Sequence, residues 1–122
     1  TTLVSLAANT WFHAAAVVAA SNSRSIYLNG GSKITDPNSC ALSIPDRFHV
    51  GSSTIPSLYI DGSVAELAVW SIALSDAEVA AVATGTLPTS VQAAGLWGYW
   101  RLDGSNPEVD LSGHGRNLAL GP

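Results

Sequence analysis

Acidic side chains that could catalyse hydrolysis are sparse along this chain of 122 residues. Cleavage of a glycosidic bond needs two carboxylates that lie about 5 to 10 Å apart. Glu66 stands alone on its predicted strand, where the alternate positions are Val64 and Ala68. We expect the chain to have no Glu-x-Asp or similar pair of carboxylates of the kind that could flank one bond. The sequence therefore favours a protein that is not an enzyme, with Glu66 as a half-buried acid that accepts hydrogen bonds from a turn.

The histidine and cysteine residues are equally isolated. His13, His49 and His114 have no serine or cysteine beside them in a nucleophile motif such as G-x-S-x-G. The single cysteine, Cys40, cannot form an internal disulfide and lacks the partner ligands of a zinc site. We expect Cys40 to be a small, partly buried apolar residue. We expect His13 to lie on a strand face or in the core, and His114 to be a turn residue.

Oxygen-bearing side chains near predicted turns are the candidate ligands of a metal ion. Calcium takes about six to eight oxygen ligands, mostly from carboxylates and carbonyls. The candidates form no dense acidic cluster, and one of them is an amide. The alternative is that the aspartates simply form turns by hydrogen bonding to nearby backbone groups. The weak candidate calcium ligands are Asn29, Asp61, Asp103 and Asp110.

Aromatic rings near strand ends or turns are the candidate sugar-stacking residues. The weak candidates for ligand binding are Tyr59, Trp97 and Tyr99. For each ring the alternative is a place in the core, and no spacing in the sequence selects a sugar site. Trp70 and Trp100 lie in continuous apolar strands. We expect both in the core, with Trp70 largely buried between a sheet and a helix.

The low charge of the chain bears on what surrounds it. Hydrophobic residues make up 47% of the sequence and charged residues only 11%, where about 25% charged is typical of soluble domains. Two explanations remain open: faces covered by neighbouring subunits, or a neutral surface rich in Ser, Thr and Asn. The net charge of −4 and the scattered basic residues argue against nucleic-acid binding. No apolar run approaches the ~20 residues of a membrane span.

The elements that position these residues are short strands separated by turn signals, the pattern of an all-β sandwich. Residues 11–19 are apolar on both faces, as in a strand covered on both sides. Residues 29–31, Asn-Gly-Gly, predict a tight turn because Asn and Gly tolerate positive φ. Residues 33–47 look like a loop with one short strand near Ala41. The other predicted strands cover 2–6, 25–28, 48–50, 58–60, 63–70, 96–102 and 117–120.

One short helix is predicted over residues 76–83. Ser75 at the N-cap and Glu78 three residues later form a capping-box pattern. Leu74 before the cap and Val79 in the first turn have the spacing of a hydrophobic staple. Gly85 is a natural stop signal.

Three stretches of the sequence follow a family pattern. Residues 11–13 with 26–30 resemble a "W-x-H-v-A … l-Y-v-D-G" hairpin, with Asn29 where Asp is usual. Residues 50–78 resemble an "i-G … f-x-G-x-i-d-e-v-x-i-W-x-x-a-L-s-x-x-E-i" segment, and residues 96–115 an "l-x-a-Y-W-p-l-d … D-x-S-G-n-G" segment. Together they resemble the laminin-G-like branch of the concanavalin A-like lectin/glucanase superfamily. The second stretch is the most specific of the three.

This resemblance implies a two-sheet antiparallel sandwich, a concanavalin A-like jelly roll, with one short capped helix. Calcium is the recurrent ion of the family, and the family's enzymes place their two carboxylates at alternate positions of one strand. The strands that normally precede the Trp11 hairpin are missing here. We therefore expect residues 1–122 to be a single laminin-G-like module that forms the C-terminal portion of a larger domain, with Thr1 at a processed or truncated start.

The sequence leaves three functions open. The first is a non-catalytic structural or assembly module of an extracellular, cell-surface or virion assembly, whose partners are protein neighbours or missing strands of the same chain. The second is a carbohydrate-binding, lectin-like or adhesion module that binds a glycan. The third is a glucanase, against which the isolated Glu66 counts heavily. Fold alone does not decide among them.

Overall fold

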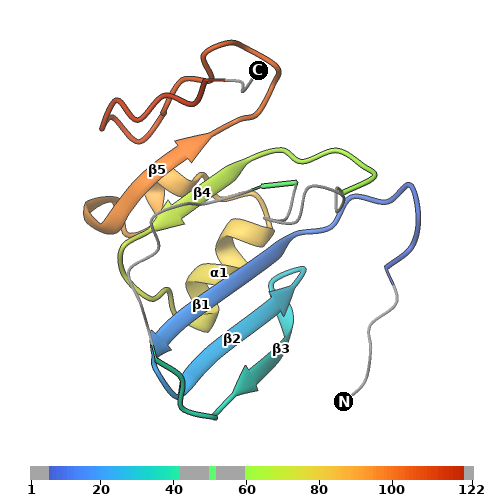
Figure 1. The fold of residues 1–122 in the computed structure, drawn as a ribbon, viewed down its shortest axis with the longest axis vertical. Helices are drawn as coiled ribbons and strands as arrows, with labels where there is room; N and C mark the ends of the chain where they lie inside the picture. Colours follow the sequence, from blue (N-terminus) through green and yellow to red (C-terminus); the bar gives the residue numbers. More distant parts are fainter. Residues whose placement is uncertain (1–5, 42–49, 52–59, 120–122) are drawn as a thin grey trace.

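A computed structural model describes residues 6–41, 50–51 and 60–119 (Figure 1). The predicted strands 2–6, 48–50 and 58–60 lie outside the described residues except for Leu6, Val50 and Ile60, and Tyr59 and His49 lie outside them as well. The elements run in the order β1 (Ala14–Ala20), β2 (Ser23–Leu28), β3 (Gly31–Asp36), β4 (Leu67–Trp70), α1 (Asp76–Ala83), the short 3-10 helices η1 (Pro88–Ser90) and η2 (Ala93–Gly95), and β5 (Leu96–Trp100).

The first three strands form an antiparallel sheet in the order β1-β2-β3. Asn29 and Gly30 have φ values of 51° and 73°, as in a type I′ turn, whose twist matches that of the flanking strands. The prediction of a loop from residue 33 was wrong, because this turn returns the chain into β3. Residues with strand preference, Ile34 and Thr35, follow the turn, and Pro37 comes directly after the strand's last residue, Asp36.

The second sheet pairs β4 with β5 in antiparallel order. The strand predicted over 63–70 is shorter than expected, because its regular pairing begins only at Leu67. Glu66 has a φ of 57°, a left-handed conformation that interrupts a regular strand. The two described sheets with one helix are consistent with a β-sandwich, in which each sheet is small.

Helix α1 begins and ends where the sequence predicts. The Ser75 hydroxyl accepts a hydrogen bond from the Glu78 backbone N–H at 3.3 Å, and the Glu78 carboxylate accepts one from the Ser75 backbone N–H at 2.8 Å. At the other end Gly85 has a φ of 105°. The backbone N–H groups of Gly85 and Thr86 donate to the carbonyls of Val82 and Ala81, which is a Schellman ending.

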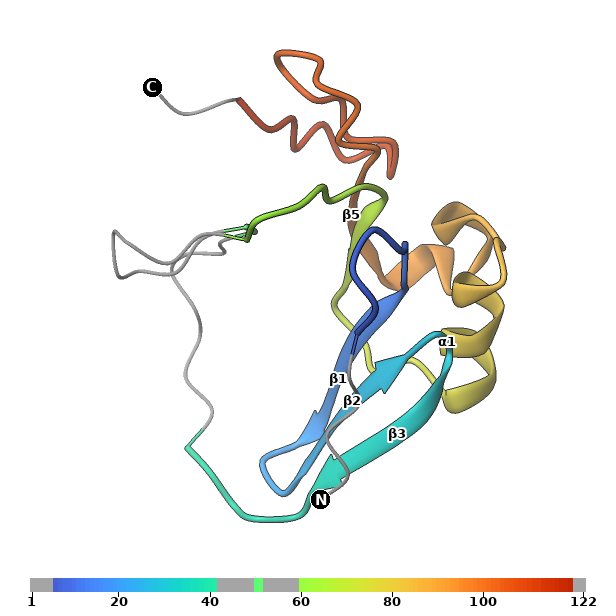
Figure 2. The same ribbon diagram turned by 90° about the vertical axis from the view of Figure 1, so that its right-hand side faces the viewer.

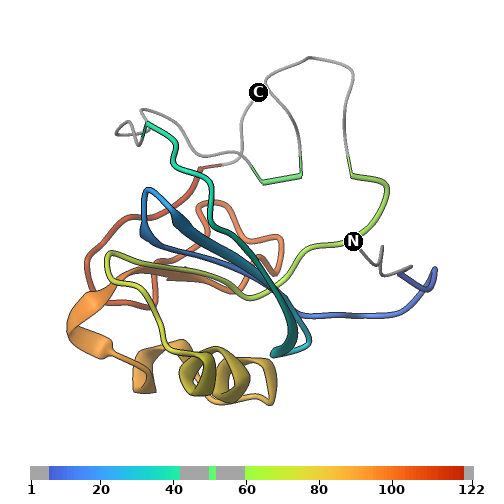
Figure 3. The same ribbon diagram turned by 90° about the horizontal axis from the view of Figure 1, so that it is seen from below.

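Helix α1 lies against one face of the three-stranded sheet, which Figures 2 and 3 show from two directions. The turn between β2 and β3 approaches the helix so closely that a Cβ added to Gly30 would lie 2.8 Å from the Cβ of Ala83. We call the face toward α1 the inner face and the opposite one the outer face. On β1 the residues of the outer face, Ala14, Ala16 and Val18, are exposed. The expectation that this strand is covered on both sides is therefore wrong for the described part of the chain.

The buried side chains gather around α1 and β5. Trp100 and Val79 are each 1% exposed, and Leu96 is 2% exposed. Trp70 is only half-buried, and its indole N–H donates to the Val91 carbonyl at 2.8 Å. The expectation of a core position is confirmed for Trp100 and only partly for Trp70, because Trp70 lies where the β4–β5 register shifts.

Candidate functional site

The outer face of the β1-β2-β3 sheet carries a row of apolar side chains. Alternation along the strands and the pairing register place Ala16 opposite Ile26, and Ile26 opposite Ile34. Ile26 is 57% exposed and Ile34 42% exposed. Val18, 53% exposed, lies in the next row. We call Ala16, Val18, Ile26 and Ile34 the outer apolar face.

Within the described residues, one pair of charged side chains, Arg24 and Asp36, lies on this face, and the two charges neutralise each other. Arg24 and Asp36 lie opposite each other and form an ion pair, and Arg24 also donates to the Asn38 carbonyl at 3.1 Å. Hydrogen bonds from the backbone and side chain of Asn38, together with the charge of Arg24, hold the pKa of Asp36 below its usual value. The face therefore presents hydrocarbon beside a neutral ion pair.

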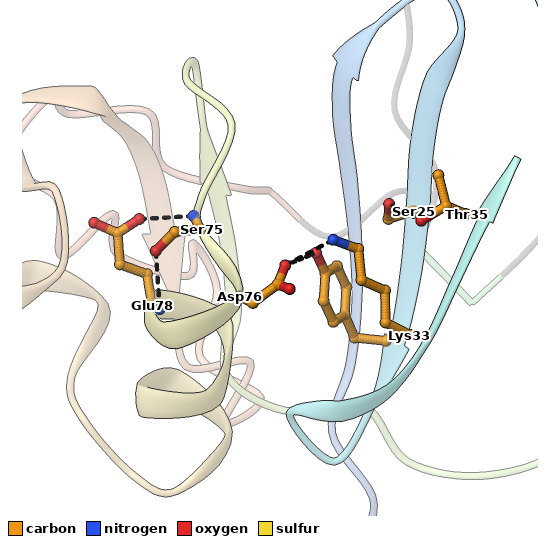
Figure 4. Close-up of polar contacts among 7 residues, drawn as sticks. Ser25, Lys33, Thr35, Ser75, Asp76 and Glu78 are labelled. Atoms are coloured by element: carbon orange, nitrogen blue, oxygen red, sulfur yellow. Dashed lines mark hydrogen bonds and ion pairs between the residues drawn. The ribbon is translucent and has the colours of Figure 1, made fainter. Parts of the chain in front are cut away.

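The opposite, inner face is tied to the helix by polar contacts, which Figure 4 shows in close-up. Lys33 on β3 forms an ion pair with Asp76 at 2.8 Å, and its ammonium lies 5.5 Å from the centre of the Tyr27 ring. The Tyr27 hydroxyl donates to the same Asp76 oxygen at 2.7 Å. Ser25 and Thr35 share a hydroxyl hydrogen bond of 2.8 Å on this side. These contacts occupy the inner face, so the outer face is the one left accessible.

The aromatic candidates differ sharply in accessibility. Trp97 is 46% exposed, whereas Tyr99 is 3% exposed and its hydroxyl donates to the Glu66 carboxylate. The Arg116 guanidinium lies 4.5 Å from the centre of the Trp97 ring and donates to the Trp97 carbonyl at 2.7 Å. Tyr59 lies outside the described residues. Of the two described candidates, Trp97 is the ring that solvent can reach.

The candidate calcium ligands hold turns of the chain itself. Asn29 accepts the His13 backbone N–H at 2.9 Å through its side-chain oxygen, and Asp103 accepts the Ser105 backbone N–H at 3.0 Å. Asp61 lies in a bend that precedes β4. Within residues 6–41, 50–51 and 60–119, no group of three or more histidine, cysteine, aspartate or glutamate side chains is placed to hold a metal ion.

Asp110 is the organising residue of the loop that follows β5. Its carboxylate accepts backbone N–H groups from Tyr99 at 3.1 Å, Ser112 at 2.9 Å and Arg116 at 3.0 Å. Burial raises the pKa of Asp110, but the hydrogen bonds from Ser112, Arg116 and Tyr99 lower it more, so the pKa lies well below its usual range. The turn-forming alternative for this residue accounts for all of these contacts.

The expectation that the chain has no Glu-x-Asp pair of carboxylates is wrong, because Glu108 and Asp110 stand at alternate positions, outside the strands that the sequence predicts. Both are buried, at 5% and 6% exposure. Glu108 accepts the Gly104 backbone N–H at 2.7 Å and pairs with Leu118 in an isolated β-bridge. The Glu-x-Asp spacing was the signal that could have found this pair. Backbone donors occupy both carboxylates, which is the arrangement of acids that hold loops in place.

The remaining reactive residues are not brought together. His13, beside β1, is half-buried, and burial lowers its pKa. The His114 ring lies 3.0 Å from the Ser112 hydroxyl in the exposed loop after Asp110, a turn position as expected. Cys40 is free and half-buried.

Comparison with known protein families gives one match. A family model described as the concanavalin A-like lectin/glucanases superfamily matches residues 1–80, about two thirds of the chain. The match covers the β1-β2-β3 sheet and β4, and it ends inside α1. Searches of curated proteins and of solved structures give no match. Across the described residues, no helix has the length and apolar character needed to cross a membrane.

Proposed function

We propose that this chain, which belongs to the concanavalin A-like lectin/glucanase superfamily, is a non-catalytic module that binds neighbouring protein through its outer apolar face. Such modules are commonly extracellular, and we place this one in an extracellular, cell-surface or virion assembly. The observation that carries the proposal is the exposure of Ile26, Ile34 and Val18 together on one face of one sheet.

Leaving this face in water forgoes the free energy that burial of its apolar side chains would provide. Burial of a fully exposed Val or Ile side chain provides about 1.5–3 kcal/mol, and these side chains are 42–57% exposed, so burial of each would provide part of that. Contiguous apolar patches are rare on free monomers and typically mark interaction sites. The charge that usually keeps such a face apart from other molecules is scarce, since charged residues make up 11% of the chain. A partner that supplies an apolar surface would be stabilised here.

Two kinds of neighbour fit this face. One is a separate protein subunit, and the other is further β-structure of the same polypeptide. Both would present an apolar sheet, since sheets pack face to face at about 10 Å.

The test compares two equally exposed positions. Ile26 is 57% exposed on the outer face, and Val109 is 56% exposed in the loop after β5. We expect the purified chain to form large assemblies by light scattering, and Ile26→Lys to reduce their mass, because it buries an ammonium in an apolar contact. The matched control Val109→Lys should leave the mass unchanged. A monodisperse monomer of the unmodified chain would contradict the proposal.

A second candidate function is carbohydrate binding, which the exposure of Trp97 favours. An exposed ring with a guanidinium beside it offers stacking and hydrogen bonding to a sugar. A glycan array probed with the chain would test this. Binding that Trp97→Ala abolishes and that Trp11→Ala retains would establish the lectin function, because Trp11 is also exposed, at 70%.

The non-catalytic part of the proposal has its own test. The Tyr99 hydroxyl is bonded to Glu66, and backbone N–H groups are bonded to Glu108 and Asp110. We expect no hydrolysis of β-glucans above the buffer rate. Turnover that disappears in Glu66→Gln or Glu108→Gln would show that the chain is an enzyme.

A further inference from the structure

The outer edge of β3 is a second surface, which borders the outer apolar face at Ile34. In the sheet order β1-β2-β3, β3 pairs with β2 along one side only. No other segment of the described chain pairs with its second side, and all of its residues are exposed. An unpaired strand edge presents backbone N–H and C=O groups that can pair with another chain.

The backbone groups that point outward from this edge follow from the pairing. The Asn29 backbone N–H donates to the His13 carbonyl at 2.8 Å, while the His13 N–H donates to the Asn29 side-chain oxygen at 2.9 Å, so His13 and Asn29 face each other at a hydrogen-bonded position of the β1–β2 ladder. Such positions alternate along antiparallel strands, which directs Arg24 and Ile26 of β2 toward β3. Their partners Asp36 and Ile34 therefore use their backbone groups inward.

It follows that the outward-pointing N–H and C=O groups of β3 belong to Lys33 and Thr35. The hydroxyl contact between Ser25 and Thr35 agrees with this assignment, because side chains lie closer in the pairs that exchange no backbone bonds.

The β2–β3 register shifts between the Ile26–Ile34 and Leu28–Gly31 pairs, and such an irregularity can hinder pairing at an edge, but it lies before Ile34 and leaves Ile34 to Asp36 in register with β2. Lysine side chains and prolines usually protect edge strands, but Lys33 is drawn to the inner face by Asp76 at 2.8 Å. Pro37 lies beyond the strand end at Asp36. The edge is thus open over Lys33, Ile34 and Thr35.

We infer that a second copy of this chain adds to the edge of β3 in antiparallel order, with the two-fold axis at Ile34. Lys33 of each copy then exchanges backbone hydrogen bonds with Thr35 of the other, which uses the outward groups of both strands. Ile34 faces its own counterpart across the axis.

The neighbouring registers of this strand pair are less favourable than the one with its axis at Ile34. An axis at Lys33 would place two ammonium groups directly opposite each other, which is destabilising. An axis at Thr35 would place Lys33 opposite Pro37, which has no N–H to donate. A slip by one residue would move apolar side chains to the inner face. The axis at Ile34 also continues the row of Ala16, Ile26 and Ile34 into the second copy.

A disulfide trap tests the register. Across an antiparallel pair that exchanges no backbone bonds, the Cα atoms lie about 4.5 Å apart, within the ~4.4–6.8 Å that a disulfide spans. In a Cys40→Ser background, Ile34→Cys should cross-link to a dimer under mild oxidation. Ile26→Cys, which is also exposed but lies on the central strand, should cross-link at least tenfold more slowly. Equal rates, or no dimer with Ile34→Cys, would overturn the inference.

A proline variant tests the backbone bonds. Thr35→Pro removes an outward N–H and leaves the ladder to β2 intact, whereas Thr35→Val keeps that N–H and loses only the Ser25 contact. We expect Thr35→Pro to abolish the Ile34→Cys cross-link and Thr35→Val to retain it, with far-UV circular dichroism confirming that both fold. Retention of the cross-link in a folded Thr35→Pro variant would overturn the inference.

The outcome is independent of the proposed function. Ile26→Lys alters the outer apolar face and leaves the β3 edge unchanged, so it should reduce large assemblies and spare the cross-link. Thr35→Pro should do the reverse.

Discussion

The two sheets of this molecule use strands of similar length in opposite ways. In β5, Leu96, Tyr99 and Trp100 are each at most 3% exposed, whereas every residue of β3 is exposed. The polar groups around β5 have partners: Asp110 accepts the Tyr99 N–H, and the Arg116 carbonyl accepts the Trp100 indole N–H at 2.7 Å. Burial of polar groups is tolerated only with such partners. The comparison indicates that stability resides mainly around β5 and that the β1-β2-β3 sheet supplies surface.

The largest expected effect contrasts two tryptophans of one strand. Trp100 is 1% exposed and Trp97 46% exposed. Trp100→Ala should destabilise the fold by about 3–5 kcal/mol, enough to unfold many small domains, whereas Trp97→Ala should cost about 1 kcal/mol. Urea unfolding followed by circular dichroism measures both. Similar losses for the two variants would show that burial does not divide β5 as described.

The next effect concerns the loop that Asp110 organises. Asp110→Asn keeps the shape but replaces a charged acceptor of several backbone N–H groups, and should cost about 1–3 kcal/mol. Because hydrogen bonds lower the folded-state pKa of Asp110, its contribution is present above the unfolded pKa of about 3.9. That contribution is lost as the pH falls further.

The unmodified chain should therefore lose more stability than Asp110→Asn between about pH 4 and pH 2. Melting temperatures recorded across that range check this. Parallel acid profiles for the two proteins would contradict a low pKa for Asp110.

A smaller effect is expected at the start of α1. Ser75→Ala removes the hydroxyl that accepts the Glu78 N–H and should cost about 0.5–2 kcal/mol. Glu78→Ala should cost less, because the Ser75 half of the capping box remains. Thermal melts of both variants test the order, and unchanged melting temperatures would mean that the caps contribute nothing.

The smallest effect is expected on the outer apolar face. Ile26→Ala removes a side chain that is 57% exposed, so the free energy of unfolding of the isolated chain should change by about 0.5 kcal/mol or less. Chemical denaturation at low protein concentration makes the measurement. A loss of several kcal/mol would place Ile26 in a core and end the distinction between the two sheets.

Local signals in the sequence predicted the helix and the first hairpin well. Ser75, Glu78 and Gly85 act within one or two turns of the backbone, so their spacing alone predicts the bounds 76–83 that the structure shows. Asn29 and Gly30 likewise predict a tight turn because of their own φ preferences. A tight turn of this kind joins two strands, yet the residues from 33 onward were predicted as a loop, so β3 was not predicted.

Contacts between distant residues were not predicted. Glu66 was expected to be half-buried and to bond to a turn, yet it is exposed and accepts the Tyr99 hydroxyl from a residue 33 positions later. Trp70 was expected to be largely buried, yet it is only half-buried, whereas Trp100, which was also expected in the core, is 1% exposed. The pair of Glu108 and Asp110 was not predicted, although its Glu-x-Asp spacing is present in the sequence.

Residue identity alone determined the turn at Asn29 and Gly30 and the two ends of the helix. A family pattern in the residues identified the superfamily, and the match over residues 1–80 confirms it. These features depend on short-range backbone preferences and on recurrent spacing. Only the tertiary structure decided which face of the β1-β2-β3 sheet meets α1. It also decided which carboxylates accept hydrogen bonds from loop backbone. Apolar residues occur on both faces of β1, and nothing local distinguishes a covered face from an open one. The contacts of Asp76 with Lys33 and Tyr27 make that choice and leave Ile26 and Ile34 exposed.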